Sequence, residues 1–256
     1  MAWYAVNRRG ESTATQPPYV DYYKFRCPSR EPVRRHIAGH VAGLSQIDGL
    51  SSIHLDYVRY PDVILPPALW AQYGLVQDRE HPEFDYCYCD ECRAQFSAQT
   101  GDDPLDLDDP TADARWRQFR FDSITRVVRE LAQVARPAGK QLTAAVFPTP
   151  SIARALVRQD WPTWELDAAL PMLHHSFYEH PVEWIEAGTR EGVEALAGNF
   201  PLYAGLYVPE LSPEALGRAV RAAHAGGTDG IALFESQAPS DEHWRVLADV
   251  LQGGAA

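Results

Sequence analysis

Short runs rich in β-branched and aromatic residues alternate along this chain with longer segments of helical periodicity, and this alternation constrains the fold most strongly. Strands that alternate with helices are typical of βαβ units and a parallel sheet. The predicted helices occupy residues 31–47, 113–136, 181–196, 213–226 and 240–251. The six predicted strands are residues 3–6, 53–58, 142–147, 166–172, 202–207 and 230–234.

Three serines mark predicted helix starts. Ser29 is followed by Pro32, Ser212 precedes Pro213, and Ser240 precedes two acidic residues. A hydroxyl at this position accepts hydrogen bonds from free amide groups, and proline is tolerated in the first helical turn. We therefore expect each serine to cap a helix.

One segment departs from the alternation. Residues 61–110 are polar, rich in Asp and Pro, and predicted to form an elaborated loop with a short helix near 91–100. The rest suits one α/β unit, because a chain of 256 residues buries a sizeable core in a single domain. We expect a single domain over residues 1–256.

Charge limits the partners of the chain. Its 35 acidic and 23 basic residues give a net charge of −12, which repels nucleic acids and anionic membranes and favours neutral or cationic ligands. No run approaches the ~20 apolar residues of a membrane span, and the first residues lack the apolar run of a signal peptide. The sequence as written predicts a cytoplasmic protein, although a truncated start would also have removed a signal peptide.

The segment IHLDYVRYPD carries the first candidate for chemistry. In a strand, His54 and Asp56 lie on one face, and Asp56 comes at the carboxyl end, where barrel enzymes carry their active sites. Arg59 and Asp62 follow at once. Asp56 is either a catalytic carboxylate or a partner that neutralises Arg59, and structural ion pairs are common.

The same segment resembles a known family. DGLSSIHLDYVRYPD resembles the fourth-strand motif of glycoside-hydrolase-like barrels related to the family 10-like glycosylhydrolases. The third and fifth to eighth strands of that family resemble, in order, MAWYAVNRRG, AAVFPTP, LDAALPMLHHSFY, PLYAGLYVPELSPE and DGIALFESQAPSDEHW. The resemblance implies a (β/α)8 TIM barrel that lacks its first two strands in this chain. A truncated start is favoured over a homo-oligomer that closes the barrel or a tolerated partial barrel.

The resemblance also implies a glycoside hydrolase acting on a carbohydrate. Such enzymes use two carboxyl groups, about 5 Å apart for retention and ~6.5–9.5 Å apart for inversion. We expect Asp56 to be the nucleophile or base and Glu235, directly after the last strand, to be the acid, with exchange of roles left open. Glu210 is the next candidate, ahead of Asp62 and Glu179. The alternative is a catalytically inactive carbohydrate-binding or scaffold barrel.

Five further residues are predicted to contact the substrate. Two of them, His174 and His175, end the sixth-strand run, and alternation lets only one enter the barrel mouth. Aromatic rings cover the apolar faces of sugars well. The predicted contacts are Arg59, His174, His175, Tyr207 and Trp3.

The cysteines form a candidate metal site. Cys87, Cys89 and Cys92 make a C-x-C-x2-C triplet, and Cys27 is the only other cysteine. Four thiolates saturate tetrahedral Zn²⁺ and leave no position for a catalytic water, so the predicted role is structural. Free buried thiols or disulfides are the alternatives. The arrangement is similar to the zinc site of family 42 β-galactosidases, in which a cysteine precedes the fourth strand and a triplet follows it.

Overall fold

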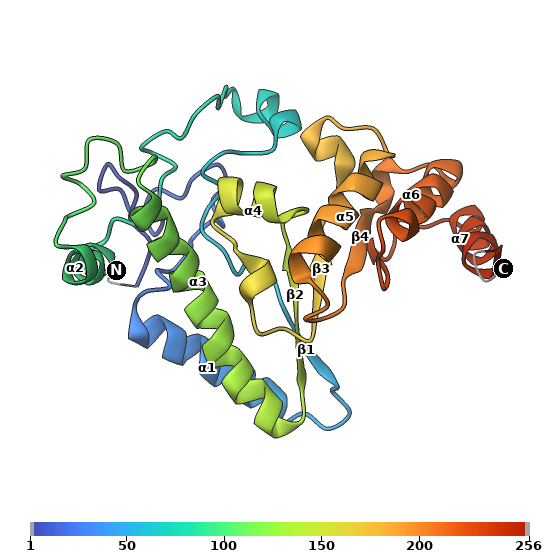
Figure 1. Ribbon diagram of the computed structural model, residues 1–256, viewed down its shortest axis with the longest axis horizontal. Coiled ribbons are helices and arrows are strands. Elements are labelled where there is room, and N and C mark those ends of the chain that lie inside the picture. The colour runs from blue at the N-terminus through green and yellow to red at the C-terminus, as the bar shows by residue number, and fades with distance from the viewer. Residues whose placement is uncertain (1–2, 254–256) are drawn as a thin grey trace.

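Five parallel strands lie at the centre of the structure, a computed structural model that describes residues 3–253 (Figure 1). Isolated parallel bridges, from Ala169 to Leu202 and from Met172 to Gly205, join two groups of strands. Neighbouring strands therefore follow chain order, which confirms the predicted parallel α/β arrangement. The first group is β1 (Ser52–Leu55), β2 (Gln141–Val146) and β3 (Ala168–Pro171), and the second is β4 (Tyr203–Tyr207) and β5 (Gly230–Phe234).

Helices follow the strands. Figure 1 shows α1 beside α3, and α5 and α6 together next to β4. The α-helices are α1 (Glu31–Ser45), α2 (Asp90–Thr100), α3 (Ala114–Ala135), α4 (Pro150–Val157), α5 (Trp184–Leu196), α6 (Pro213–Ala225) and α7 (Asp241–Gly253). Short 3₁₀ helices are η1 (Pro67–Leu69), η2 (Ala71–Tyr73), η3 (Arg136–Ala138), η4 (Trp161–Thr163), η5 (His175–Tyr178) and η6 (Val208–Glu210). All six predicted helices are present, whereas α4 was not predicted.

Two of the three serines cap helices as expected. The Ser212 hydroxyl accepts a hydrogen bond from the Ala215 amide, and the Ser240 hydroxyl accepts one from the His243 amide at 3.5 Å. The prediction for Ser29 is wrong: α1 begins one residue later than such a cap requires, and the Ser29 hydroxyl bonds to that of Ser123 at 3.1 Å. A buried hydroxyl partner on α3 has displaced the helix end.

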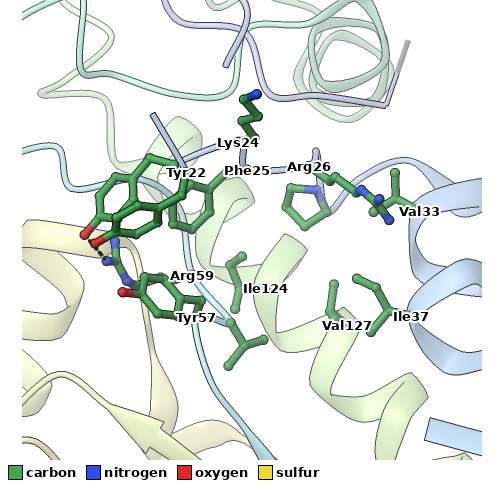
Figure 2. A pocket seen from close by; sticks show the side chains of 13 residues that line it. Tyr22, Lys24, Phe25, Arg26, Val33, Ile37, Tyr57, Arg59, Ile124 and Val127 are labelled. Carbon is green, nitrogen blue, oxygen red and sulfur yellow. Dashed lines mark hydrogen bonds between the residues drawn. The ribbon is translucent and has the colours of Figure 1, made fainter. Parts of the chain in front are cut away.

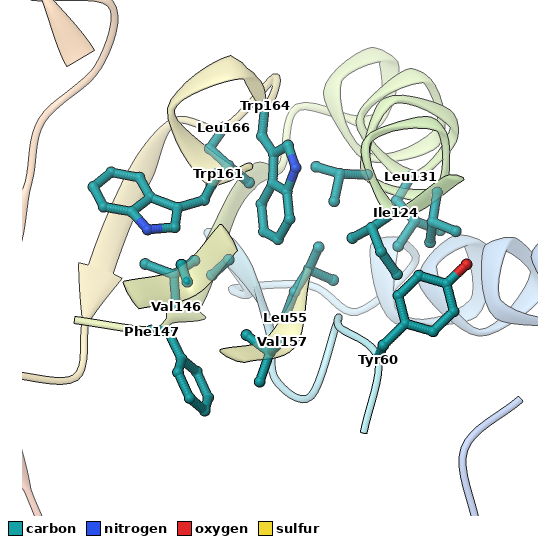
Figure 3. Packing of buried hydrophobic residues seen from close by; sticks show 14 of the residues in the cluster. Leu55, Tyr60, Ile124, Leu131, Val146, Phe147, Val157, Trp161, Trp164 and Leu166 are labelled. Atoms are coloured by element: carbon teal, nitrogen blue, oxygen red, sulfur yellow. The ribbon is translucent and has the colours of Figure 1, made fainter. Parts of the chain in front are cut away.

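Apolar side chains from strands and helices meet in a large buried cluster. Figure 3 shows Leu55 of β1 and Val157 of α4 packed between the Trp161 indole and the Tyr60 ring. A second buried cluster joins β4 to α5 and α6. Removal of this apolar surface from water is the main force that holds the helices on the strands.

The first predicted strand is wrong. Residues 3–6 do not join the parallel strands; Tyr4 forms an antiparallel bridge with Arg26, and Val6 forms one with Ser12. The Asn7 side chain accepts hydrogen bonds from the Arg9 and Glu11 amides and closes a tight turn. This segment pairs instead with chain outside the sheet, both near and far in sequence, since Asn7 also bridges Tyr86 of loop 61–110.

The row of strands stays open. Within residues 3–253, β1 and β5 each pair with a strand on one side only, so no closed barrel is found. β5 differs from the central strands because all five of its residues are only partly buried. None of the helices in the described part of the chain is long and apolar enough to cross a bilayer.

The elaborated loop 61–110 is anchored by buried charge. Asp85 forms an ion pair with Arg120 of α3, and both side chains are fully buried. Glu80 forms a second ion pair with Arg158, which follows α4 and is 1% exposed. These two pairs fix the loop against the helical layer.

We predict that Gly205 is required for the close approach of β3 and β4. A Cβ at this position would lie 2.7 Å from the Pro171 carbonyl oxygen, so Gly205→Ala should lower the free energy of unfolding by about 2 kcal/mol. The control is Gly39→Ala on the exposed side of α1, where nothing lies within 4 Å and a gain of ~0.5–1 kcal/mol is expected. Urea unfolding measures both; equal stabilities for the two variants would contradict the prediction.

Candidate functional site

A cavity of about 300 Å³ lies at the carboxyl ends of the five strands. We call it the cleft. Parallel strands present these ends at one edge of the sheet, so segments far apart in sequence meet there. Its lining is mainly apolar and aromatic, with a few polar groups. The lining residues are Tyr23, Asp56, Tyr57, Arg59, Asp62, Leu65, Pro66, Leu69, Ala145, Phe147, Gln159, Met172, His174, Phe177, Tyr178, Tyr207 and Phe234.

Asp56 presents an exposed carboxylate to the cleft. β1 ends at Leu55, earlier than predicted, so Asp56 lies just beyond the strand. One carboxylate oxygen accepts the Tyr57 amide at 2.8 Å, and Tyr57 adopts a left-handed backbone with φ 54°. Such strained residues cluster at functional sites. The turn leaves the Tyr57 ring 48% exposed at the edge of the cleft.

Arg59 pairs with Asp62 rather than with Asp56. The guanidinium lies 2.8 Å from the Asp62 carboxylate, and both side chains are buried. It also donates a hydrogen bond to the Tyr23 hydroxyl at 3.2 Å. Four aromatic rings surround it at 5.2–5.5 Å, those of Tyr23, Phe25, Tyr57 and Phe147. The charge of Arg59 is thus already balanced, and among the described residues Asp56 forms no ion pair.

A second cavity, of about 370 Å³, lies behind the same wall. Figure 2 shows Tyr57 and Arg59 on one side of it and Val33 and Ile37 of α1 on the other. Ile124 and Val127 of α3 complete its apolar lining. Tyr23, Tyr57 and Arg59 line both cavities, so the aromatic cage of Arg59 separates them.

His174 lines the cleft, and His175 does not. Alternation was expected to admit only one of them, but β3 ends at Pro171, so both histidines lie beyond the strand and alternation does not decide which one enters. The His174 side chain is buried, and its Nε2 has no hydrogen-bond partner within the described structure. Burial lowers the pKa of His174 to about 4, so the ring is neutral near pH 7. Its Nε2 can therefore form one hydrogen bond with a ligand.

The other predicted site residues lie outside the cleft lining. Glu235 is exposed and directly follows Phe234, which does line the cleft. Glu210 is exposed at the end of η6, and its charge acts on His175, whose pKa is lowered by burial. Trp3 lies under the Arg26 guanidinium, away from the cleft. The cleft therefore collects Asp56, Arg59, His174 and Tyr207 from the predicted set, together with the lower-ranked candidate Asp62.

The four cysteines form one buried cluster. Their sulfur atoms all lie within 4.8 Å of one another, which matches tetrahedral zinc, since Zn–S bonds of ~2.3 Å place the sulfurs ~3.8 Å apart. The thiols are free, with 3.4 Å between the sulfurs of Cys27 and Cys92. We call Cys27, Cys87, Cys89 and Cys92 the four-cysteine cluster.

The surroundings of the four-cysteine cluster favour a thiolate at one position. Burial raises the pKa of Cys87 and the hydrogen bond with Cys27 raises that of Cys92, whereas Cys89 is shifted the other way. Hydrogen bonds from the other three thiols lower the pKa of Cys89, and the thiolate is the form that binds metal. The Val6 amide donates to the Cys87 sulfur at 3.3 Å. Burial alone would lower the pKa of the nearby Arg30. The charge of Cys89 acts in the opposite direction, and the pKa of Arg30 is raised. The donor set and its charge balance fit a metal ion held by four thiolates.

Comparison with known proteins identifies the fold. No family model and no curated protein matches the sequence. The glycoside hydrolase domain of PgaB (BpsB) from Bordetella bronchiseptica is similar over 96% of this chain and 68% of that chain, with a TM-score of 0.63 and 13% identity. The fold is glycoside-hydrolase-like. Bee venom hyaluronidase matches over 63% of this chain and 60% of its own, with a TM-score of 0.37 and 10% identity, and is too distant to add to this.

Sequence reasoning missed Gln159 in this glycoside-hydrolase-like fold. Its buried side chain accepts the Phe147 amide at 2.9 Å and donates to the Val58 carbonyl at 3.2 Å. Gln159 thereby ties the segment after β1 to the end of β2, inside the cleft. No motif marks it, because a lone glutamine after a short helix has no distinctive sequence pattern.

We expect His174 to make the protein sensitive to acid. Burial lowers its pKa to about 4, whereas an unfolded histidine titrates near ~6.5, so the unfolded chain binds more protons between these values. Stability should fall as the pH drops through this window, by up to about 3 kcal/mol. Urea unfolding at about pH 7 and about pH 4.5 measures the loss of stability between these values, and His174→Gln should lose less than wild type. The exposed His224→Gln is the control; parallel losses in wild type and His174→Gln would contradict the assignment.

Proposed function

We propose that this chain binds saccharide in the cleft and hydrolyses a glycosidic bond there. The observation that supports it most is that the exposed Asp56 carboxylate and the buried His174 ring, whose Nε2 has no partner among the described residues, line one aromatic cavity at the ends of parallel strands. Aromatic rings cover the apolar faces of sugars, and a neutral imidazole bonds to a hydroxyl. The net charge of −12 favours a neutral or cationic saccharide.

In the proposed mechanism Asp56 is the nucleophile or base. Glu235 is the proposed acid, supported by its position directly after Phe234, a residue that lines the cleft. Glu210 is the alternative, supported by its position after β4. A pair of carboxyl groups at the scissile bond would supply the proton transfer and the attack that hydrolysis needs.

The second candidate function is saccharide binding without turnover. One observation favours it: of the two carboxylates that line the cleft, Asp62 is held in the ion pair with Arg59. Asp56 is thus the carboxylate of the lining that is not held in an ion pair. Binding needs only the rings and His174, whereas hydrolysis also needs a carboxylate from outside the lining.

Substitution of the two proposed carboxylates tests the choice. Asp56→Asn should lower kcat on a cleavable oligosaccharide by a factor of about 10²–10⁴, because the proposed nucleophile or base is removed. Glu235→Gln should have a similar effect, while both variants keep saccharide affinity by calorimetry. The control is Glu194→Gln, exposed on α5. Wild-type rates in both variants would end the hydrolase proposal, and saccharide binding without turnover in the wild type would establish the second function.

The finer fold assignment is also a proposal. We propose that β1 to β5 are the consecutive strands of a partial (β/α)8 barrel, supported by their parallel direction and chain order. The proposal includes a homo-oligomer, in which a second copy of the chain covers the open edges of β1 and β5.

For the four-cysteine cluster we propose one structural Zn²⁺. Four thiolates complete its coordination, so the ion would act by tying loop 61–110 to the segment before α1. This role is supported by chain positions, since Cys27 precedes α1 and the triplet lies in the loop.

Metal analysis tests this role. Protein purified without added zinc should carry about one equivalent by native mass spectrometry, and Cys27→Ser should lose it because a ligand is gone. Asp56→Asn is the control and should keep the metal, since Asp56 is outside the cluster. Wild-type protein without bound metal would remove the proposal.

A further inference from the structure

The second cavity, behind the cage of Arg59, has no part in the proposed hydrolysis. Its volume of about 370 Å³ is within the range of small-molecule sites in proteins, about 300–1,000 Å³. Asp56 and His174 line the cleft and do not line this cavity. The two cavities have in common only the wall formed by Tyr23, Tyr57 and Arg59, so the second cavity is a separate compartment.

Aliphatic side chains form the buried part of the second cavity. Val33 and Ile37 come from α1, and Ile124 and Val127 come from α3. Figure 2 shows Ile37 and Val127 together, at the end away from the Tyr57 ring. An apolar group that fills such a space gains free energy because its surface leaves water, whereas sugar hydroxyls would lose their hydrogen bonds there. This part of the cavity therefore suits the apolar body of a ligand.

The charge of the second cavity is opposite to that of the whole chain. The chain has a net charge of −12, yet among the described residues that line this cavity none is acidic and three are cationic. Arg59 is balanced by the Asp62 carboxylate. The side chains of Lys24 and Arg26 are exposed and form no ion pair with any residue of the described part of the chain. The rim of the cavity therefore has uncompensated positive charge.

Arg26 is the cation that is better placed for a ligand. Figure 2 shows its side chain beside Val33, whereas Lys24 extends away from the aliphatic side chains. A guanidinium binds a carboxylate through paired hydrogen bonds, and Lys24 adds attraction at longer range. A doubly charged phosphate is less suited, since the chain as a whole is acidic. The polar end of the ligand is accordingly a carboxylate.

We propose that the second cavity is a binding site for a small carboxylate with an apolar body, of the size of a medium-chain fatty acid. The apolar body lies against Ile37, Ile124 and Val127, and the carboxylate pairs with Arg26 at the rim. Neither Asp56 nor any cysteine lines this cavity, so the proposal depends on neither hydrolysis nor metal.

Calorimetric titration of the full chain with hexanoate, octanoate and octanol tests the site. Octanoate should bind at one site per chain, about fifteenfold more tightly than hexanoate, because two more methylene groups leave water. Octanol should bind about fivefold more weakly than octanoate, since it lacks the charge that pairs with an exposed arginine. Equal affinities for octanoate and octanol, or an absence of saturable octanoate binding, would overturn the proposal.

Substitution of Arg26 tests the polar end of the site. Arg26→Gln should weaken octanoate binding about fivefold and leave octanol binding unchanged, because only the ion pair is lost. Arg117→Gln is the matched control, since Arg117 is an exposed arginine of α3 outside the lining, and it should change neither affinity. Wild-type affinity for octanoate in Arg26→Gln would contradict the proposed pairing.

Filling the cavity tests the apolar end. Ile37→Phe should weaken both octanoate and octanol by about tenfold, because the larger ring takes the space of the ligand. Leu44→Phe, at an exposed position of the same helix outside the lining, should bind both ligands like wild type. Asp56→Asn should bind octanoate at least as well as wild type. Unchanged binding in Ile37→Phe, or loss of binding in Asp56→Asn, would place the ligand elsewhere and overturn the proposal.

Discussion

Parallel pairing of β1 to β5 is the constraint on which the site depends. Because the strands run in one direction and in chain order, every carboxyl end opens at the same edge, and each is followed by a segment that must cross back over the sheet. Side chains at the end of a strand, or up to three residues past it, therefore converge. Asp56, His174 and Phe234 come from three different strands and share one cavity for this reason.

The long loop after β1 is held by interactions that are costly to break. Arg120 and Arg158 are both buried, and burial followed by the charge of Arg120 lowers the pKa of Arg158. Two guanidinium groups this close are tolerable only while Asp85 and Glu80 are present. Loss of one partner would leave an uncompensated buried charge, at a cost of about 3–5 kcal/mol. The loop thus has one specified position, which brings its cysteines to Cys27.

Periodicity predicted the long helices and the five parallel strands, since amphipathic spacing and β-branched runs are local properties. It could not predict α4, whose eight residues are too few for a clear period, or the bridges of residues 4–7 to Ser12, Arg26 and Tyr86, because such contacts depend on where the long loops lie. The place of Asp56 in the cleft was predictable because the residue lies near the carboxyl end of the predicted strand 53–58, in a segment that resembles a glycoside-hydrolase-like motif, whereas its catalytic role stays a prediction. The place of a second carboxylate was not predictable, because side-chain direction is free once a strand has ended, as Glu210 in η6 illustrates.

The same geometry separates the requirements of binding from those of hydrolysis. Arg59 neutralises Asp62 within an aromatic cage, so Asp56 is the exposed carboxylate of the cleft lining. The rings and His174 that line the cleft lie mostly at or after the ends of β1 to β4, strands whose inner residues are buried, although the Phe234 ring belongs to β5. Glu235, in contrast, follows β5, an edge strand whose residues are all partly exposed. The proposed binding would therefore depend mainly on the well-packed part of the sheet, while the proposed two-carboxylate chemistry would depend on how firmly its open edge is held.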